Sequence, residues 1–125
     1  MKQYLAVILT GLFISLLLPG CTPAETAPST SPAIRGNITN RNAGAGGDLV
    51  GSVLVEGQVE ADTSFDKASI AVTAKTQIFE QIGSERRPAT FEALQVGRTV
   101  EAWFEGPVAE SYPVQATASD IVILK

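Results

Sequence analysis

Apolar and polar residues alternate along several short stretches from about residue 34 onward, which is the pattern of β-strands with one buried face. The predicted strands cover residues 34–39, 52–60, 67–80, 98–105 and 114–124, whereas residues 90–94 form either a short strand or a single helical turn. The side chains expected to face the core are those of Val53, Val55, Val59, Ala68, Ile70, Val72, Ala74, Val100, Ala102, Phe104, Val114, Ala116, Ala118, Ile121 and Ile123.

Breaks in this alternation locate the connections. Gly-rich residues 40–51 predict a loop, residues 81–88 a turn, and residues 106–113 a loop bounded by Gly and Pro. The inward-facing set changes phase between Ala118 and Ile121, so a β-bulge is expected near Ser119-Asp120.

The number of strands indicates the fold class. About five or six strands without a clear helix indicate an all-β chain. A small closed barrel suits such a chain because it leaves no exposed sheet edge. An immunoglobulin-like sandwich, which has about seven evenly spaced strands, is the alternative.

The N-terminus has the three parts of a secretory signal: an early positive charge, an uncharged apolar run over residues 4–18, and a small residue before Cys21. The run is shorter than the roughly 20 residues that a membrane-spanning helix needs. The string Leu18-Pro19-Gly20-Cys21 resembles the lipobox of bacterial lipoproteins, which implies that Cys21 is lipidated and begins the mature chain. Simple secretion and an uncleaved membrane anchor are the alternatives.

Three regions follow from this interpretation: a lipoprotein signal peptide over residues 1–20, the lipidated Cys and a flexible linker over 21–33, and the barrel over 34–125. The linker is rich in Pro, Ser and Thr and has no periodicity, as expected of an extended tether. We therefore expect an extracytoplasmic protein that a lipid anchors to the cell membrane or the outer membrane.

Composition narrows the possible chemistry. The chain has one Cys and no His, so a Ser-His-Asp triad, a Cys-His pair and a His zinc site are excluded, and no cofactor or metal is expected. The formal net charge is −4, or −5 without the leader and its Lys2, which argues against nucleic-acid binding. Any general acid or base would have to be a carboxylate, Lys or Tyr.

The C-terminal half carries a family resemblance. Gly97, Val100, Trp103 and Gly106, the segment ESYPVQA at residues 110–116, and the final ASDIVI at residues 118–123 resemble the YobA-like family of small, uncharacterised bacterial lipoproteins. The resemblance covers roughly residues 34–124 and is strongest over 96–123. It implies an OB-like barrel of five or six strands on a lipid tether, and it implies no catalytic residues.

Four residues are candidates for ligand or partner binding. Tyr112, Pro113 and Gln115 lie in or beside the predicted loop before the last strand, and Trp103 points outward by strict alternation. Each also has a structural interpretation. Tyr112 then packs on the barrel while Pro113 directs the chain into the last strand, and Trp103 covers a barrel end or packs under the Gly-rich loop.

Other polar clusters show no motif for chemistry. The Gly-rich loop lacks the ending of a phosphate-binding loop, and Glu56, Glu60, Asp62 and Asp66 lack the spacing of a calcium loop. Arg86-Arg87 is expected in a solvated turn, although it could touch anionic headgroups.

These observations support one main hypothesis about function. We expect a non-enzymatic envelope lipoprotein that binds a protein or a small envelope ligand. The alternatives are a carboxylate-based hydrolase or cation-dependent enzyme of the envelope, and a purely structural surface protein.

Overall fold

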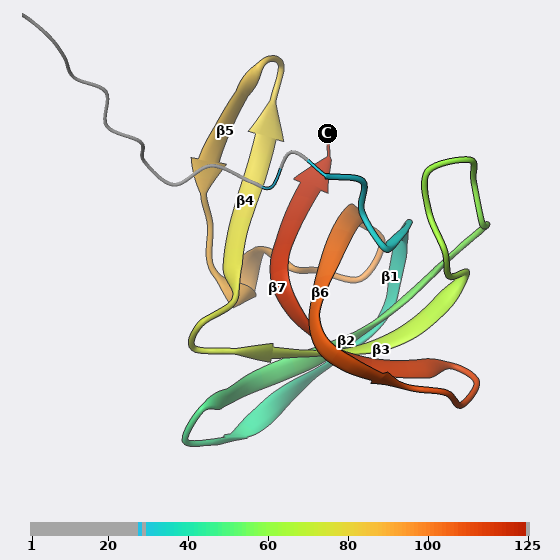
Figure 1. Cartoon of the computed structure of the whole chain (residues 1–125). Coiled ribbons are helices and arrows are strands. Elements are labelled where there is room, and N and C mark those ends of the chain that lie inside the picture. The colour runs from blue at the N-terminus through green and yellow to red at the C-terminus, as the bar shows by residue number, and fades with distance from the viewer. Residues whose placement is uncertain (1–27, 29, 125) are drawn as a thin grey trace, which may run out of the picture.

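The computed structural model describes residue 28 and residues 30–124, and nearly all of its regular structure is β-strand (Figure 1). The leader and Cys21 lie outside the described residues, so the predictions for them stay predictions. Within the described part, no helix has the length and apolar character needed to cross a membrane. The elements are β1 (Ile34–Gly46), β2 (Leu49–Gly57), β3 (Lys67–Thr73), β4 (Gln77–Ile82), β5 (Glu85–Pro88), the 3₁₀ turn η2 (Phe91–Ala93), β6 (Thr99–Ala109) and β7 (Val114–Leu124).

Five of the seven strands formed by residues 30–124 close into a ring. Hydrogen-bonded neighbours follow the order β3-β2-β1-β6-β7-β4-β5, and a parallel pairing of β3 with β7 closes the circle. The first three strands form an antiparallel meander, and β6 and β7 complete the barrel. The predicted OB-like barrel is confirmed, and closure leaves no free edge between β3 and β7.

The barrel interior follows the alternation predicted from the sequence. On β3, Ala68, Ile70 and Val72 are buried while the residues between them are partly exposed. The expected bulge in β7 is confirmed, because Asp120 pairs with Trp103 and Ala118 pairs with Phe104, which leaves Ser119 unpaired. This extra residue restores the inward direction of Ile121 and Ile123, which are fully buried.

One end of the barrel is filled by the turn η2. Phe91 and Leu94 are buried in the main core, so the helical-turn interpretation of residues 90–94 is the correct one. Gly51 on β2 lies directly beneath the Phe91 ring, and a Cβ atom at this position would overlap that ring. The packing of η2 on β2 therefore requires a residue without a side chain at position 51.

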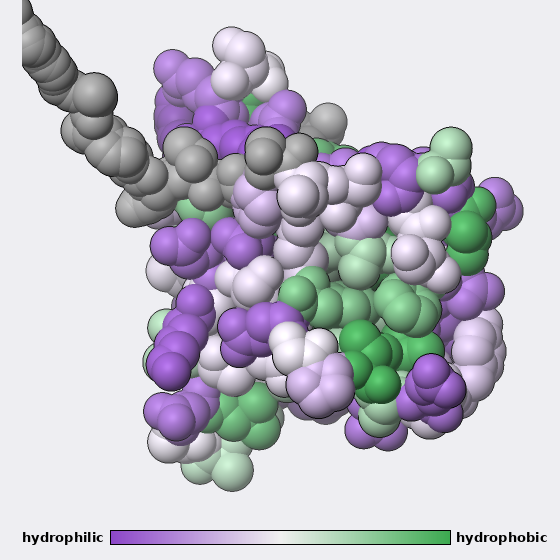
Figure 2. Space-filling model, viewed as in Figure 1, coloured by the Kyte–Doolittle hydropathy of each residue, from purple (hydrophilic) through white to green (hydrophobic). Residues whose placement is uncertain are grey.

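Two strands lie outside the ring. β4 pairs in parallel with the second half of β7, and β5 folds back on β4 as a hairpin that projects from the barrel (Figure 1). On the outer side of the sheet, Phe79, Trp103 and Val122 form a second buried cluster, with Leu124 packed against it. The rest of the visible surface is mostly polar, apart from apolar residues gathered beside β6 (Figure 2).

Several local predictions are wrong. The sequence predicts a loop over 40–51, but β1 and β2 continue as a long hairpin that turns near Gly46 and Gly47, both with positive φ. The turn predicted over 81–88 contains β5, and β6 extends into the predicted loop as far as Ala109. Val59 is 57% exposed because β2 ends at Gly57.

Candidate functional site

A groove lies on the outer face of β2, β3 and β7. Two hairpins that reach beyond the ring, β1–β2 and β6–β7, stand on either side of it (Figure 1). Its volume is about 450 Å³. The lining residues are Leu49, Ser52, Ser69, Ala71, Pro107, Val108, Ala109, Gln115, Ala116 and Thr117.

Strand pairing explains why these side chains converge. Ser69 and Ala71 alternate with the buried residues of β3 and therefore point outward. Gln115 of β7 lies opposite Ser69, and Thr117 lies opposite Ala71. Ser52 of β2 is the partner of Ala71 on the other side. The outward side chains of three neighbouring strands therefore lie side by side on the same surface.

The groove is uncharged and offers free hydrogen-bonding groups. None of its lining residues carries an ionisable side chain. Within residues 30–124, the side chains of Ser52, Ser69, Gln115 and Thr117 make no hydrogen bond to another residue. A neutral polar ligand could therefore replace water on these groups without breaking a contact inside the protein.

Tyr112 extends this surface beyond the groove. Its side chain is exposed (70%), its hydroxyl donates to Asp66 Oδ2 at 3.3 Å, and the Lys67 ammonium lies 5.7 Å from the ring centroid. Desolvation, and then the charge of Asp66, raises the pKa of Tyr112 above its ordinary value of 10.0. Because Lys67 precedes Ser69 by two residues on β3, the ring stands at the end of the same face.

The structure brings three of the four predicted site residues together. Tyr112 and Pro113 are the last two residues of the β6–β7 connection, and Gln115 follows two residues later inside the groove. The Ser111 hydroxyl stabilises this connection by donating a hydrogen bond to the Pro113 carbonyl oxygen at 2.8 Å.

Trp103 lies elsewhere. It points out of the barrel, as alternation predicts, but only 8% of it is exposed, so the solvent exposure expected of a contact residue is not found. The indole ring is covered by Phe79 of β4, and its Nε1–H donates to the Thr30 carbonyl oxygen at 2.9 Å. The alternation of apolar and polar residues in β6 predicts neither the contact with Phe79 nor the one with Thr30.

Sequence reasoning missed the hydroxyl residues of the groove. Ser52, Ser69 and Thr117 fall on the outward positions of three predicted strands, which alone indicates solvent exposure. Only the parallel pairing of β3 with β7 shows that they share one surface.

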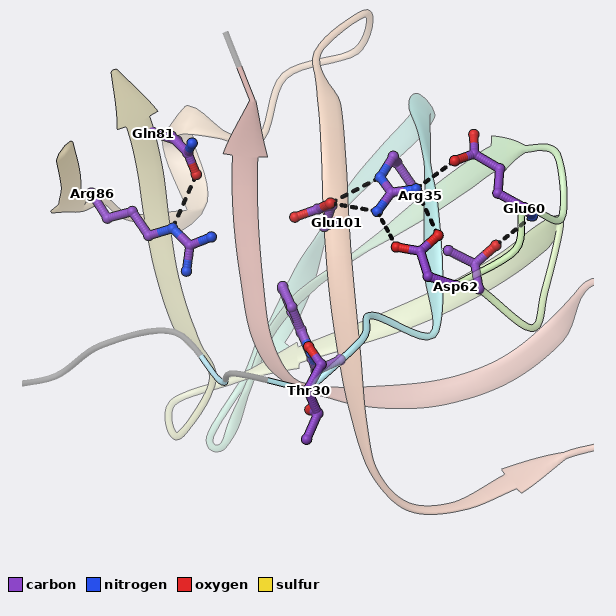
Figure 3. A network of polar contacts seen from close by, with 9 residues as sticks. Thr30, Arg35, Glu60, Asp62, Gln81, Arg86 and Glu101 are labelled. Carbon is purple, nitrogen blue, oxygen red and sulfur yellow. Dashed lines mark hydrogen bonds and ion pairs between the residues drawn. The ribbon is translucent and has the colours of Figure 1, made fainter. Parts of the chain in front are cut away.

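A second polar cluster surrounds Arg35 on β1 (Figure 3). Its guanidinium donates to Asp62 at 2.7 Å and to Glu101 at 2.8 Å, and it also donates to Glu60. The hydrogen bond from Arg35 lowers the pKa of Asp62. The carboxylates of the β2–β3 connection and of β6 are therefore held by a cation on β1.

This cluster does not favour the hydrolase alternative. A general acid needs a raised carboxyl pKa, whereas Arg35 shifts the pKa of Asp62 downward. The other two acidic residues of the predicted cluster have other partners: Glu56 accepts from Thr39 at 2.8 Å, and Asp66 accepts from Tyr112. Among the described residues, no group of three or more His, Cys, Asp or Glu side chains is placed to hold a metal ion.

The basic pair lies on the projecting hairpin. Arg86 and Arg87 belong to β5, all of whose residues are exposed. Arg86 donates to the Gln81 side chain at 3.0 Å and Arg87 donates to Glu85 at 3.4 Å, so both pair locally across or along the hairpin.

Comparison with known proteins identifies a family. The family described as "Protein of unknown function (DUF3221)" matches residues 52–125, which is more than half of the chain. The match includes the last two thirds of β2, every later element, and all residues of the groove except Leu49. No curated protein and no solved structure matches the chain.

Proposed function

The chain belongs to the DUF3221 family, whose function is unknown, and we propose that it is a non-enzymatic binding module of the bacterial cell envelope. The observation that carries this proposal is the position of the groove. OB barrels bind their ligands on the face of their second and third strands, between the loop that joins strands one and two and the loop that joins strands four and five. In this barrel those parts are β2, β3 and the β1–β2 and β6–β7 hairpins, which border the groove.

The ligand in this proposal is a neutral oligosaccharide. OB barrels bind oligonucleotides and oligosaccharides on this face, and a chain with a formal net charge of −4 and an uncharged groove disfavours nucleic acid. Free hydroxyl and amide groups match the hydroxyl groups of a sugar, and the exposed Tyr112 ring offers an apolar surface for one sugar face.

The proposal includes attachment to a membrane. The lipobox-like string ending at Cys21 and the apolar run before it support lipidation at that residue. The motifs that resemble YobA-like lipoproteins lie within the range that the family matches, and we include membership of that group in the proposal.

Titration of the chain with neutral oligosaccharides, followed by calorimetry and by NMR shifts of groove amides, tests the groove. Gln115→Ala should weaken binding roughly 2- to 10-fold, because it removes one hydrogen-bonding group. Ser69→Arg should abolish binding, since it places a long charged side chain at the centre of the groove. Ser84→Ala, which alters an exposed hydroxyl in the β4–β5 turn, is the matched control.

Binding that survives Ser69→Arg would show that the groove is not the site. If neutral sugars fail to bind while an envelope protein is captured in a Gln115-dependent manner, the module recognises protein instead, and the ligand class proposed here is wrong.

Membrane attachment has a separate test. Cys21→Ser should release the protein from the membrane fraction or leave it as an unprocessed precursor, because the acceptor of the lipid is removed. A Cys21→Ser chain that still partitions with membranes at the mature size would contradict lipidation.

A further inference from the structure

The Trp103 side chain is buried by the N-terminal segment as well as by the sheet. The indole lies on the outer face of β6, where Phe79 and Val122 pack around it from β4 and β7. Pro28, Thr30, Ser31 and Pro32 lie across the same surface, and two of the hollows between this segment and the barrel are lined in part by Trp103. A tryptophan on the outside of a barrel is therefore almost fully enclosed.

The contact has defined hydrogen bonds at both ends of a short segment. At one end the Trp103 Nε1–H donates to the Thr30 carbonyl oxygen at 2.9 Å. At the other, the Ala33 N–H donates to the Ala102 carbonyl oxygen at 2.9 Å, and the Ala33 carbonyl oxygen accepts from the Ser64 and Phe65 N–H groups. The chain is thus attached to the barrel before its first strand begins.

The composition of the segment suits this role. Pro28 and Pro32 restrict the backbone to extended conformations, so less conformational entropy is lost when the segment is immobilised. Extended segments of this kind present carbonyl oxygens outward, and a Trp N–H that is buried requires such an acceptor.

We propose that the outer surface around Trp103 is an intramolecular docking site for Pro28 and residues 30–33, which thereby form a strap that belongs to the folded domain. The strap includes the last residues of the segment that composition assigns to a flexible linker. Without it, Trp103 would be exposed and its indole N–H would lose its protein acceptor.

The strap also has a defined position relative to the strands of the ring. In the ring order β1-β2-β3-β7-β6, the strands not adjacent to β6 are β2 and β3. The contact between the strap and Trp103 of β6 therefore lies away from β2 and β3.

Trp103 is the single tryptophan of the chain, so its signals report the strap directly. The test compares acrylamide quenching of Trp103 fluorescence in the full-length chain in detergent with that in the triple variant Pro28→Gly/Thr30→Gly/Pro32→Gly. We expect quenching to rise roughly two- to threefold in the variant, because its more flexible backbone undocks and exposes the ring. Pro23→Gly, outside the strap, is the matched control and should leave quenching unchanged.

A second measurement needs no variant. The single indole N–H resonance of the unmodified chain should exchange with solvent much more slowly than a free indole, because Thr30 accepts its hydrogen bond. Unchanged quenching in the triple variant, or an indole N–H that exchanges as fast as free indole, would overturn the strap. Neither readout depends on ligand binding or on Cys21, so a failure of the proposed function leaves this test intact.

Discussion

At the scale of single residues, Arg35 joins parts of the chain that are far apart in sequence. Its guanidinium contacts Glu60 and Asp62 in the β2–β3 connection and Glu101 on β6. The connection is otherwise polar and has few apolar residues to bury, so these contacts hold it against the barrel. Single exposed ion pairs contribute little to stability. Several carboxylates that bind one guanidinium in a fixed geometry contribute more.

Asp62 makes this network sensitive to acid. The hydrogen bond from Arg35 lowers its pKa below the ordinary value of 3.8, so the contact stabilises the fold above that pH and is lost as the pH falls through the folded-state pKa. Asp62→Asn should therefore reduce stability near neutral pH and reduce the loss of stability on acidification. Urea denaturation at about pH 7 and about pH 3 measures both effects.

Asp48→Asn is the control for this prediction, because Asp48 forms no ion pair within the described part of the chain. If Asp62→Asn and wild type lose the same free energy of unfolding on acidification, the contact with Arg35 contributes nothing to the pH dependence.

At the scale of elements, the turn η2 depends on the barrel for its stability. It contains three residues, and its N-terminal residue Thr90 makes no side-chain cap. A turn this short is not stable alone, so burial of Phe91 and Leu94 holds it in place. Arg41 adds to this cap, since its guanidinium lies 4.2 Å from the centroid of the Phe91 ring.

Leu94→Ala should destabilise the protein by about 2–5 kcal/mol, because the fully buried side chain closes the barrel end and its removal leaves a cavity. Val96→Ala, two residues further along and 61% exposed, should change stability by less than about 0.5 kcal/mol. Denaturant unfolding measures both. Equal effects of the two substitutions would show that η2 does not seal the core.

At the scale of the whole molecule, two apolar clusters share the same strands. The main core lies inside the ring, and the smaller cluster of Phe79, Trp103 and Val122 lies outside it. β7 contributes Ile121 and Ile123 to the first and Val122 to the second, so neither cluster can lose its packing without disturbing the other.

We therefore expect one cooperative unfolding transition. Trp103 fluorescence reports the outer cluster, and far-ultraviolet circular dichroism reports the strands of the ring. Their midpoints in urea should coincide, because consecutive residues of β7 belong to both clusters. An earlier fluorescence transition would mean that the β4–β5 hairpin and the outer cluster open as a separate unit.

The alternation of apolar residues by itself determined the class of the fold, most strand positions, most of the inward-facing set and the bulge at Ser119, because these depend on a local period of two. It placed the candidates Tyr112, Pro113 and Gln115 beside the last strand. It did not determine the ends of β1, β2 and β6, since Gly-rich segments can form either loops or hairpins.

Only the tertiary structure decided which outward positions form a groove and which are covered. Ser69 and Gln115 meet through a parallel pairing between strands more than forty residues apart in the sequence. Trp103 is covered by β4 and by residues at the opposite end of the chain. A period of two assigns each side chain to a face of its strand, but what lies against that face depends on contacts between distant segments, which no local pattern encodes.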